Sequence, residues 1–96
     1  MNLPVPVSFE WDKGNLDKNW NKHKVGYKEA EEVFTDEGLI TYEDIKHSQK
    51  EVRLVALGKT NNGRKLYIVF TIRNKKVRII SARDQNLKER KLNEKK

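Results

Sequence analysis

Histidine and arginine side chains are the groups in this chain best suited to move a proton and to bind phosphate. His23 follows Lys22 near the end of an expected helix. Imidazole titrates near neutral pH, so His23 could accept or donate a proton in phosphodiester cleavage while adjacent cations hold the phosphate. A lone histidine beside a lysine is more often an ordinary surface residue, so the possibility that His23 takes no part in catalysis stays open.

Three charged residues of the second half could complete such a site. Glu51 and Arg53 lie two residues apart in an expected strand, so their side chains share a face. They could line a site together, although an ion pair at a sheet edge explains the same spacing better. Arg83 ends the β-branched run of residues 77–83. Because burying an unpaired guanidinium is costly, either a carboxylate or a bound phosphate must satisfy Arg83.

The positive charge is concentrated in the second half of the chain. Of the net charge of +7, residues 1–48 contribute −4 and residues 49–96 contribute +11, and all six arginines lie in the second half. A guanidinium matches phosphate oxygens bidentately, so this asymmetry favours RNA as a partner, although charge alone also suits a solvated surface. We expect Arg73 and Arg78 to join Lys22 in binding RNA.

Several classes of protein are disfavoured by what the sequence lacks. It contains no cysteine, and it has no glycine-rich phosphate loop, no G-x-S-x-G and no His-Glu-x-x-His. We therefore expect no cofactor and no metal site. The opening residues do not resemble a secretion signal, and no apolar run reaches 18 residues, so we expect a cytoplasmic protein that does not enter a membrane.

The first half is expected to form a strand and two helices within a single domain of residues 1–96. Residues 7–11 alternate apolar with polar and predict a short edge strand. Residues 15–23 predict a helix that turns Leu16 and Trp20 inward, with His23 on the same side, and a second helix follows Gly26. Residues 1–6 and 93–96 are expected to be loose.

The second half is expected to form an antiparallel meander and a last helix. The predicted strands are residues 39–43, 50–59, 65–73 and 76–83. Asn62-Gly63 predicts a hairpin in which both central residues have positive φ, and Asn74-Lys75 is a weaker signal of the same kind. If Arg73 lies opposite Lys76, regular pairing places Arg83 on the core face. Asp84 is the candidate N-cap of the last helix, and the fold class is α+β.

Short motifs along the chain resemble the BrnT family of bacterial type II toxin–antitoxin toxins. They cover about residues 9 to 90 and include Phe9-Glu-Trp-Asp12, Lys22-His23, Glu51-x-Arg53, Arg78-Ile-Ile-Ser-Ala-Arg83 and Glu89-Arg90. Between these motifs the matching residues are Asn19, Val25-Gly26-Tyr27, Ala30, Phe34, Asp36, His47 and Gly58. The chain departs from the family pattern after His23, where Lys24 replaces the usual glycine. Leu92 also stands where a tyrosine is common.

The resemblance implies a RelE-like fold and a metal-independent endoribonuclease that cleaves messenger RNA and arrests growth. It also implies a BrnA-like antitoxin, with operator DNA bound only by the toxin–antitoxin complex. By the same resemblance, His23, Glu51, Arg53 and Arg83 belong to the active site and Lys22 lies beside it. A 2′-hydroxyl would attack the adjacent phosphate, His23 or Glu51 would move the proton, and the two arginines would stabilise the phosphoryl charge.

Two alternatives to an enzyme remain. The basic sheet could bind nucleic acid without cutting it, as a binding module or as a subunit of a repressor complex. The expected strands carry only Tyr42, Tyr67 and Phe70 as aromatic residues, which is poor support for an open base-stacking platform. A protein-interaction domain with a solvated charged face is the third possibility.

Overall fold

A five-stranded sheet and three α-helices make up the computed structural model, which describes residues 3–4 and 6–94. The elements in chain order are β1 (Phe9–Glu10), α1 (Lys13–His23), α2 (Tyr27–Val33), β2 (Ile40–Glu43), the 3-10 helix η1 (Ile45–His47), β3 (Leu54–Lys59), β4 (Lys65–Arg73), β5 (Lys76–Asp84) and α3 (Leu87–Glu94). This order confirms the expected α+β layout. Within the described residues, no helix is both long and apolar enough to span a membrane.

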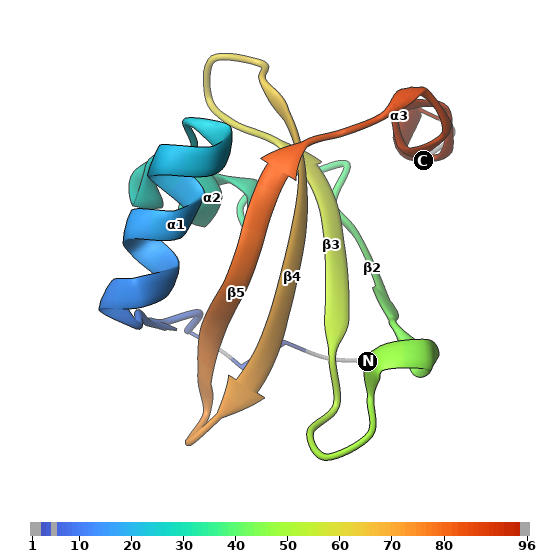
Figure 1. The fold of residues 1–96 in the computed structure, drawn as a ribbon. Coiled ribbons are helices and arrows are strands. Elements are labelled where there is room, and N and C mark those ends of the chain that lie inside the picture. Colours follow the sequence, from blue (N-terminus) through green and yellow to red (C-terminus); the bar gives the residue numbers. More distant parts are fainter. Residues whose placement is uncertain (1–2, 5, 95–96) are drawn as a thin grey trace.

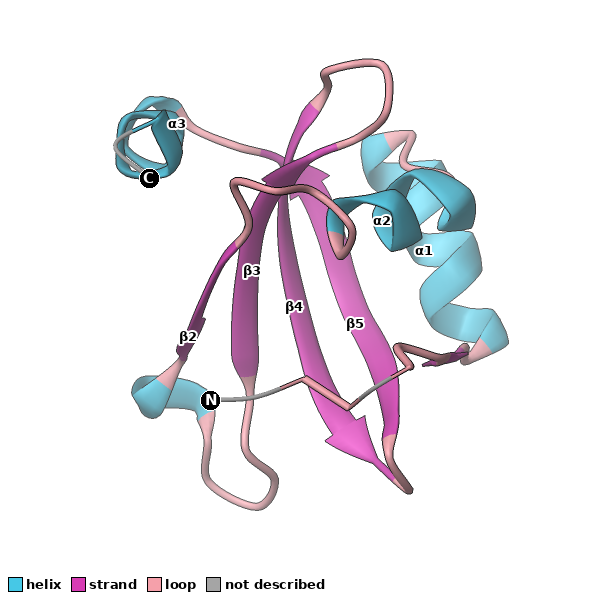
Figure 2. Ribbon diagram, turned by 180° about the vertical axis from the view of Figure 1, so that it is seen from behind, coloured by secondary structure: helices cyan, strands magenta, loops and turns pink. Residues whose placement is uncertain are grey.

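The sheet has a helix on only one of its faces. Its strand order is β1-β5-β4-β3-β2, in which β2 to β5 form the predicted antiparallel meander and β1 is an edge strand parallel to β5. Figure 2 shows α2 lying across one face. Figure 1 looks onto the other, which we call the uncovered face, with α1 beside β5 and α3 beyond β3. We call the end where β3 and β5 stop the upper end, as drawn in Figure 1.

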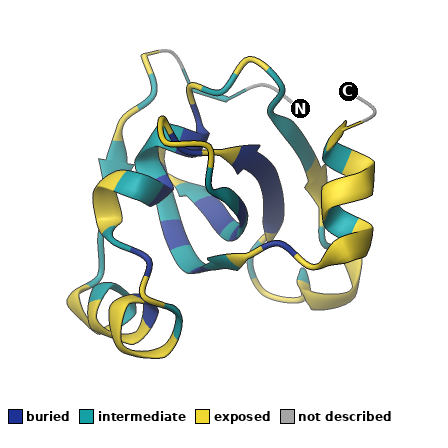
Figure 3. Ribbon diagram, turned by 90° about the horizontal axis from the view of Figure 1, so that it is seen from above, coloured by how far each residue is buried: buried dark blue, intermediate teal, exposed yellow. Residues whose placement is uncertain are grey.

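The core lies between α2 and the sheet. Ala30, Val33 and Phe34 from the α2 segment are buried with Leu66, Ile68 and Phe70 of β4 in one core cluster, against which the partly buried Ile72 also packs. The rings of Phe34 and Phe70 meet edge to face, with 5.0 Å between their centroids. Each such side chain contributes about 2 kcal/mol through removal from water, so this layer supplies much of the stability. Seen from above, the buried segments concentrate in the middle of the sheet, and α1 and α3 border it on opposite sides (Figure 3).

The β4–β5 hairpin turns as predicted but then departs from regular pairing. Asn74 and Lys75 both have positive φ, 54° and 62°, as a two-residue turn requires. Pairing is regular from Arg73 opposite Lys76 to Phe70 opposite Ile79, after which Val69 lies opposite Ser81. Ile80 is thus an extra residue, a β-bulge.

The bulge corrects the predicted position of Arg83. Beyond Ile80, Ala82 lies opposite Ile68 on the core face and is fully buried. Arg83 lies opposite Tyr67 and therefore points to the uncovered face. The prediction of Arg83 on the core face was wrong because one inserted residue reverses the faces of all residues after it.

The β3–β4 hairpin is present, with a different turn from the one predicted at Asn62-Gly63. Gly63 has a φ of 85°, whereas Asn62 is not among the residues with positive φ. Gly63 N–H donates to the Thr60 carbonyl at 2.9 Å, and Thr60 N–H donates to the Arg64 carbonyl at 2.9 Å. This is a three-residue loop with glycine in the left-handed position, so only one residue needs positive φ.

Helix α1 turns asparagines, rather than Trp20, toward the sheet. Asn19 is 2% exposed, and its Oδ1 accepts a hydrogen bond from the backbone N–H of Ala82 at 3.2 Å. Asn15 Nδ2 donates to the Ile79 carbonyl at 3.4 Å. These amides satisfy backbone groups of β5 that the short β1 does not reach. Trp20 is 53% exposed, so the prediction that it faces the core was wrong.

Two element boundaries also differ from the prediction. Strand β3 begins at Leu54, so Glu51 lies in the loop before it. Helix α3 is capped by Asn86 rather than Asp84: Glu89 N–H donates to Asn86 Oδ1, and Asn86 N–H donates to Glu89 Oε1, each at 2.9 Å. Asp84 instead ends β5.

The expectation of loose chain ends falls partly on residues 1–2, 5 and 95–96, which lie outside the described residues. Of the remainder, Leu3 packs against the core and Asn93 donates to the Gly38 carbonyl at 2.9 Å.

Replacing Lys24 by glycine is expected to stabilise the protein. Lys24 is the C-cap of α1 with φ 55° and ψ 38°, a left-handed conformation that glycine adopts without strain. We expect Lys24→Gly to raise the free energy of unfolding by about 1 kcal/mol in urea titrations. Lys28→Gly, inside α2, should lower it by a similar amount. A destabilised Lys24→Gly variant would contradict the helix-end geometry.

Candidate active site

Four arginines of the sheet region share the uncovered face. Arg73 lies opposite Lys76, Arg78 opposite Thr71 and Arg83 opposite Tyr67. Arg53 precedes β3, and its carbonyl accepts the Asp44 N–H at 2.8 Å, which continues the β2–β3 pairing by one residue. Strand alternation then puts Arg53 on the side of Val55 and Leu57. Arg78 and Arg83 share this face only because of the bulge between them.

Two of these arginines are occupied by carboxylates near the lower end of the sheet. Arg73 Nη2 lies 2.7 Å from Glu51 Oε2, and Arg78 reaches Glu10 at 2.9 Å and Asp12 at 3.1 Å. To bind RNA, as predicted, either guanidinium must use the N–H donors that its carboxylates leave free or release a carboxylate. Arg53 is exposed and has no carboxylate partner among the described residues.

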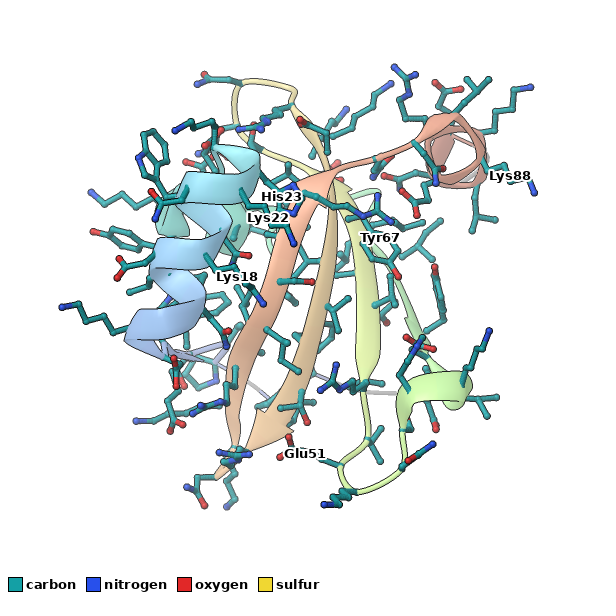
Figure 4. The ribbon with its side chains drawn as sticks, in the orientation of Figure 1. Lys18, Lys22, His23, Glu51, Tyr67 and Lys88 are labelled. Carbon is teal, nitrogen blue, oxygen red and sulfur yellow. The ribbon has the colours of Figure 1, made fainter. Side chains whose placement is uncertain are left out.

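The structure does not bring Glu51 near His23. Glu51 pairs with Arg73 instead of Arg53, and Figure 4 shows it at the opposite end of the sheet from His23. Tyr67 and Arg73 are six residues apart along β4, which corresponds to about 20 Å. The predicted site residues therefore divide into two groups: His23 with Arg83 at the upper end, and Glu51 with Arg73 at the lower end.

Arg83 is the centre of a compact cluster at the upper end. Its guanidinium stacks on the Tyr67 ring, 3.9 Å from the centroid. Its two terminal nitrogens donate to the two oxygens of Glu89, each at 2.9 Å. A carboxylate therefore occupies one end of the Arg83 guanidinium. We call Tyr42, Tyr67, Arg83 and Glu89 the tyrosine–arginine cluster.

The ionisation of the cluster favours protonated phenols beside a charged pair. Burial raises the pKa of Tyr67 and of Tyr42, although the charge of Arg83 acts in the opposite direction. Burial would also raise the pKa of Glu89, but hydrogen bonds from Arg83 and from the Asn86 N–H, with the attraction to Arg83, hold it below its usual range. At neutral pH the cluster thus offers hydroxyl donors, a guanidinium and a carboxylate.

Arg64 fixes the end of α1 next to this cluster. It donates to the carbonyl oxygens of His23 at 3.1 Å and Lys24 at 2.8 Å. It also donates to both carboxylate oxygens of Asp84, at 2.7 Å and 3.1 Å. The Arg64 hydrogen bond lowers the pKa of Asp84, and the nearby His23 acts in the same direction. His23 is consequently held close to the end of β5.

Lysines of α1 border the same end of the uncovered face. Lys18 and Lys22 are one helical turn apart and point from α1 toward β5, next to His23, whereas Lys88 on α3 points away from the sheet (Figure 4). Neither α1 lysine forms an ion pair within the part of the chain that the structure describes. Their positive charge is therefore available to a phosphate backbone.

Sequence reasoning missed several members of this site. Tyr67, Tyr42 and Glu89 were not candidates, because only the bulged register brings them together around Arg83. Lys18 could have been found, since its spacing of four from Lys22 puts both on one side of a helix. Nothing near Arg64 in sequence signals its contacts, which join residues 41 positions apart.

Other clusters of polar residues lie elsewhere. A hollow of about 660 Å³ involves Asp36, Lys59 and Asn93, and no residue of the tyrosine–arginine cluster lines it. His47 is exposed and pairs with Asp44 at 2.8 Å. Among the described residues, no three His, Asp or Glu side chains are grouped so that they could hold a metal ion together.

Comparisons with known proteins agree on one family. Residues 11–89 match the family model for "Ribonuclease toxin, BrnT, of type II toxin-antitoxin system". The fold is similar to that of the Brucella abortus ribonuclease toxin BrnT, known from a 1.1 Å crystal structure, with a TM-score of 0.63 and 18% identity over 83% of this chain and 97% of that one. No curated protein sequence matches the chain.

Removing Arg64 is expected to destabilise the protein and to loosen the end of α1. Arg64→Ala leaves two helix-end carbonyls and the Asp84 carboxylate without their donor, so we expect a loss of about 2 kcal/mol in the free energy of unfolding. Chemical denaturation measures the loss, and amide exchange at Val25 should accelerate. Arg90→Ala, an exposed arginine of α3, serves as the control. Equal stability of the two variants would contradict the role of Arg64.

The Arg83–Glu89 pair should make stability depend on pH in one direction. Because the pKa of Glu89 is lowered on folding, its stabilising effect is complete above the ordinary carboxyl range and is lost as the pH falls through the folded value. We expect Glu89→Gln to be less stable than the wild type by about 1 kcal/mol at pH 7. The difference should shrink below about pH 4. A constant difference across this range would contradict the ion pair.

Proposed function

Because the chain belongs to the BrnT family of ribonuclease toxins of type II toxin–antitoxin systems, we propose that its active site is the tyrosine–arginine cluster with His23 at its border. The observation that carries this proposal is the position of Arg83, which the bulge turns onto the uncovered face. Arg83 there stacks on Tyr67, and Arg64 holds His23 close by. A proton-transfer group, a hydroxyl donor and a guanidinium thus lie at the same end of the sheet (Figure 4).

The proposed reaction is cleavage of RNA by its own 2′-hydroxyl. The 2′-oxygen attacks the adjacent phosphorus, the bond from phosphorus to the 5′-oxygen breaks as that oxygen takes a proton from solvent water, and the products carry a 2′,3′-cyclic phosphate and a 5′-hydroxyl. His23 accepts the proton of the 2′-hydroxyl, since imidazole titrates near neutral pH. Arg83 stabilises the charge that develops on the phosphoryl oxygens. The protonated hydroxyl of Tyr67 donates a hydrogen bond to the same oxygens. These steps use side chains alone, so we propose that cleavage needs no metal.

Arg53 and Glu51 take different parts in this proposal. Arg53 comes one residue before Leu54, which lies opposite Phe70, so continuing the register puts Arg53 level with Thr71, four residues or about 13 Å along β4 from Tyr67. On the same face and without a carboxylate partner, it is placed to bind an RNA phosphate away from the cleaved bond. Glu51 is held by Arg73 and is too far from His23 to share its proton transfer.

Lysines at the border of the face support RNA as the substrate, which we propose to be messenger RNA. Lys18 and Lys22 lie next to His23 (Figure 4) and form no ion pair with any described residue, and such charges attract a phosphate backbone whatever its sequence. The same charge would suit an acidic surface on a BrnA-like antitoxin that covers the site. We propose that the protein acts in the cytoplasm, arrests growth, and meets operator DNA only within the toxin–antitoxin complex.

Alanine variants of Arg83 and His23 test the proposed site. Purified wild-type protein should cleave RNA equally well with and without a chelator. Arg83→Ala and His23→Ala should each reduce the cleavage rate by roughly two to three orders of magnitude and abolish growth arrest. His47→Ala removes the other histidine of the chain and should leave the rate unchanged.

Two outcomes would contradict the proposal. If both folded variants cleave RNA at the wild-type rate, the site lies elsewhere. If the wild type binds RNA without cutting it, the protein is a nucleic-acid-binding module instead of an enzyme.

A further inference from the structure

The hydrogen bonds of Arg83 leave one edge of its guanidinium free. A guanidinium has five N–H donors. Nη1 donates to Glu89 Oε1 at 2.9 Å and to the Asp84 carbonyl at 3.0 Å, and Nη2 donates to Glu89 Oε2 at 2.9 Å. The two remaining donors are the Nε–H and the second N–H of Nη2, and neither has an acceptor within the part of the chain that the structure describes.

These two free donors are parallel and lie on the same edge of the group. Such an edge can bind two oxygens of a phosphate bidentately, just as the end of the group binds the two oxygens of Glu89. Tyr67 covers one flat side of the guanidinium at 3.9 Å, and Glu89 covers its end. A phosphate can therefore contact the Nε and Nη2 edge without displacing any group that already binds Arg83.

Glu89 is itself held firmly, which makes its displacement by a substrate costly. Its side chain is only 14% exposed. Its Oε1 accepts the Asn86 N–H at 2.9 Å and the Arg83 Nη1–H at 2.9 Å, so one carboxylate both caps α3 and binds the arginine. Moving the Glu89 side chain away would break the bidentate pair and also one of the two hydrogen bonds of the α3 capping box.

From these contacts we propose that Glu89 is a positioning residue, which holds Arg83 so that its Nε and Nη2 edge receives the phosphate at the cleaved bond. This inference rests on the proposed role of Arg83 in cleavage. Glu89 touches neither the substrate nor the reacting atoms in this arrangement. Glu89 acts through Arg83: Glu89 and the Tyr67 ring together fix the direction of the Arg83 guanidinium.

The test compares two substitutions on the same helix. Glu89→Gln keeps an oxygen for the Asn86 N–H cap but loses the charged, two-point contact with Arg83. Glu94→Gln is the matched control, because Glu94 also lies on α3 and pairs with a cation, Lys65, at 3.3 Å. With a short RNA substrate, we expect Glu89→Gln to lower kcat on the order of ten- to a hundredfold with little change in KM, since a misdirected catalytic group affects the rate more than binding. Glu94→Gln should cleave like the wild type.

A double variant separates positioning from a general structural effect. If Glu89 acts only through Arg83, then Glu89→Gln should add no further loss to the residual activity of Arg83→Ala. Losses that multiply would overturn the proposal. Thermal unfolding of each variant confirms that the compared proteins are folded.

Three further outcomes would each contradict either the positioning role of Glu89 or the proposed function. A Glu89→Gln variant that binds a non-cleavable 2′-O-methyl RNA more tightly, and cleaves the normal RNA at least as fast, would show that Glu89 competes with phosphate and would overturn positioning. If Arg83→Ala is inactive while Glu89→Gln cleaves like the wild type, only this inference fails. If Arg83→Ala itself retains full activity, the proposed function of the cluster fails first.

Discussion

The extra residue in β5 is the constraint on which the rest of the site depends. Side chains of a regular strand alternate between faces, so Arg78 and Arg83, five positions apart, would point to opposite sides of the sheet. Ile80 adds one residue and restores both to the same side. It also turns Ala82 into the core, where this residue is fully buried. One bulge therefore serves the packing of one face and the chemistry of the other.

The uneven charge of the chain is partly cancelled once the chain is folded. Arg78 pairs with Glu10 and Asp12, and Arg64 binds Glu29, so carboxylates of the acidic half neutralise guanidinium groups of the basic half. Cations with no such partner among the described residues include Lys18 and Lys22 of α1, which belong to the acidic half of the sequence. The charge that an RNA would meet at the upper end of the sheet is thus set by contacts between distant segments, and the count of residues in each half does not describe it.

Local sequence signals predicted the elements well, because periodicity and turn chemistry act over a few residues. The Asn74-Lys75 turn and the core-facing residues Phe70 and Ile72 were found in this way. Trp20 was misplaced because the helix has two candidate inner sides, and satisfying the backbone of β5 with Asn19 outweighed burying an indole. The bulge has no glycine or proline to mark it, and the contacts of Arg64 span some forty residues. Such features follow from tertiary pairing and could not be predicted from one sequence.

The asparagines of α1 have a further consequence for how this sheet meets other chains. Beyond the short β1, the outer edge of β5 would offer unpaired N–H and C=O groups, which invite an added strand from another molecule. Asn15 and Asn19 already occupy two of these groups, at Ile79 and Ala82. The side-chain amides of α1 thus occupy the edge of β5 where a further strand could otherwise pair. The helix closes that border of the sheet to intermolecular strand pairing, the contact through which β-sheet proteins commonly aggregate.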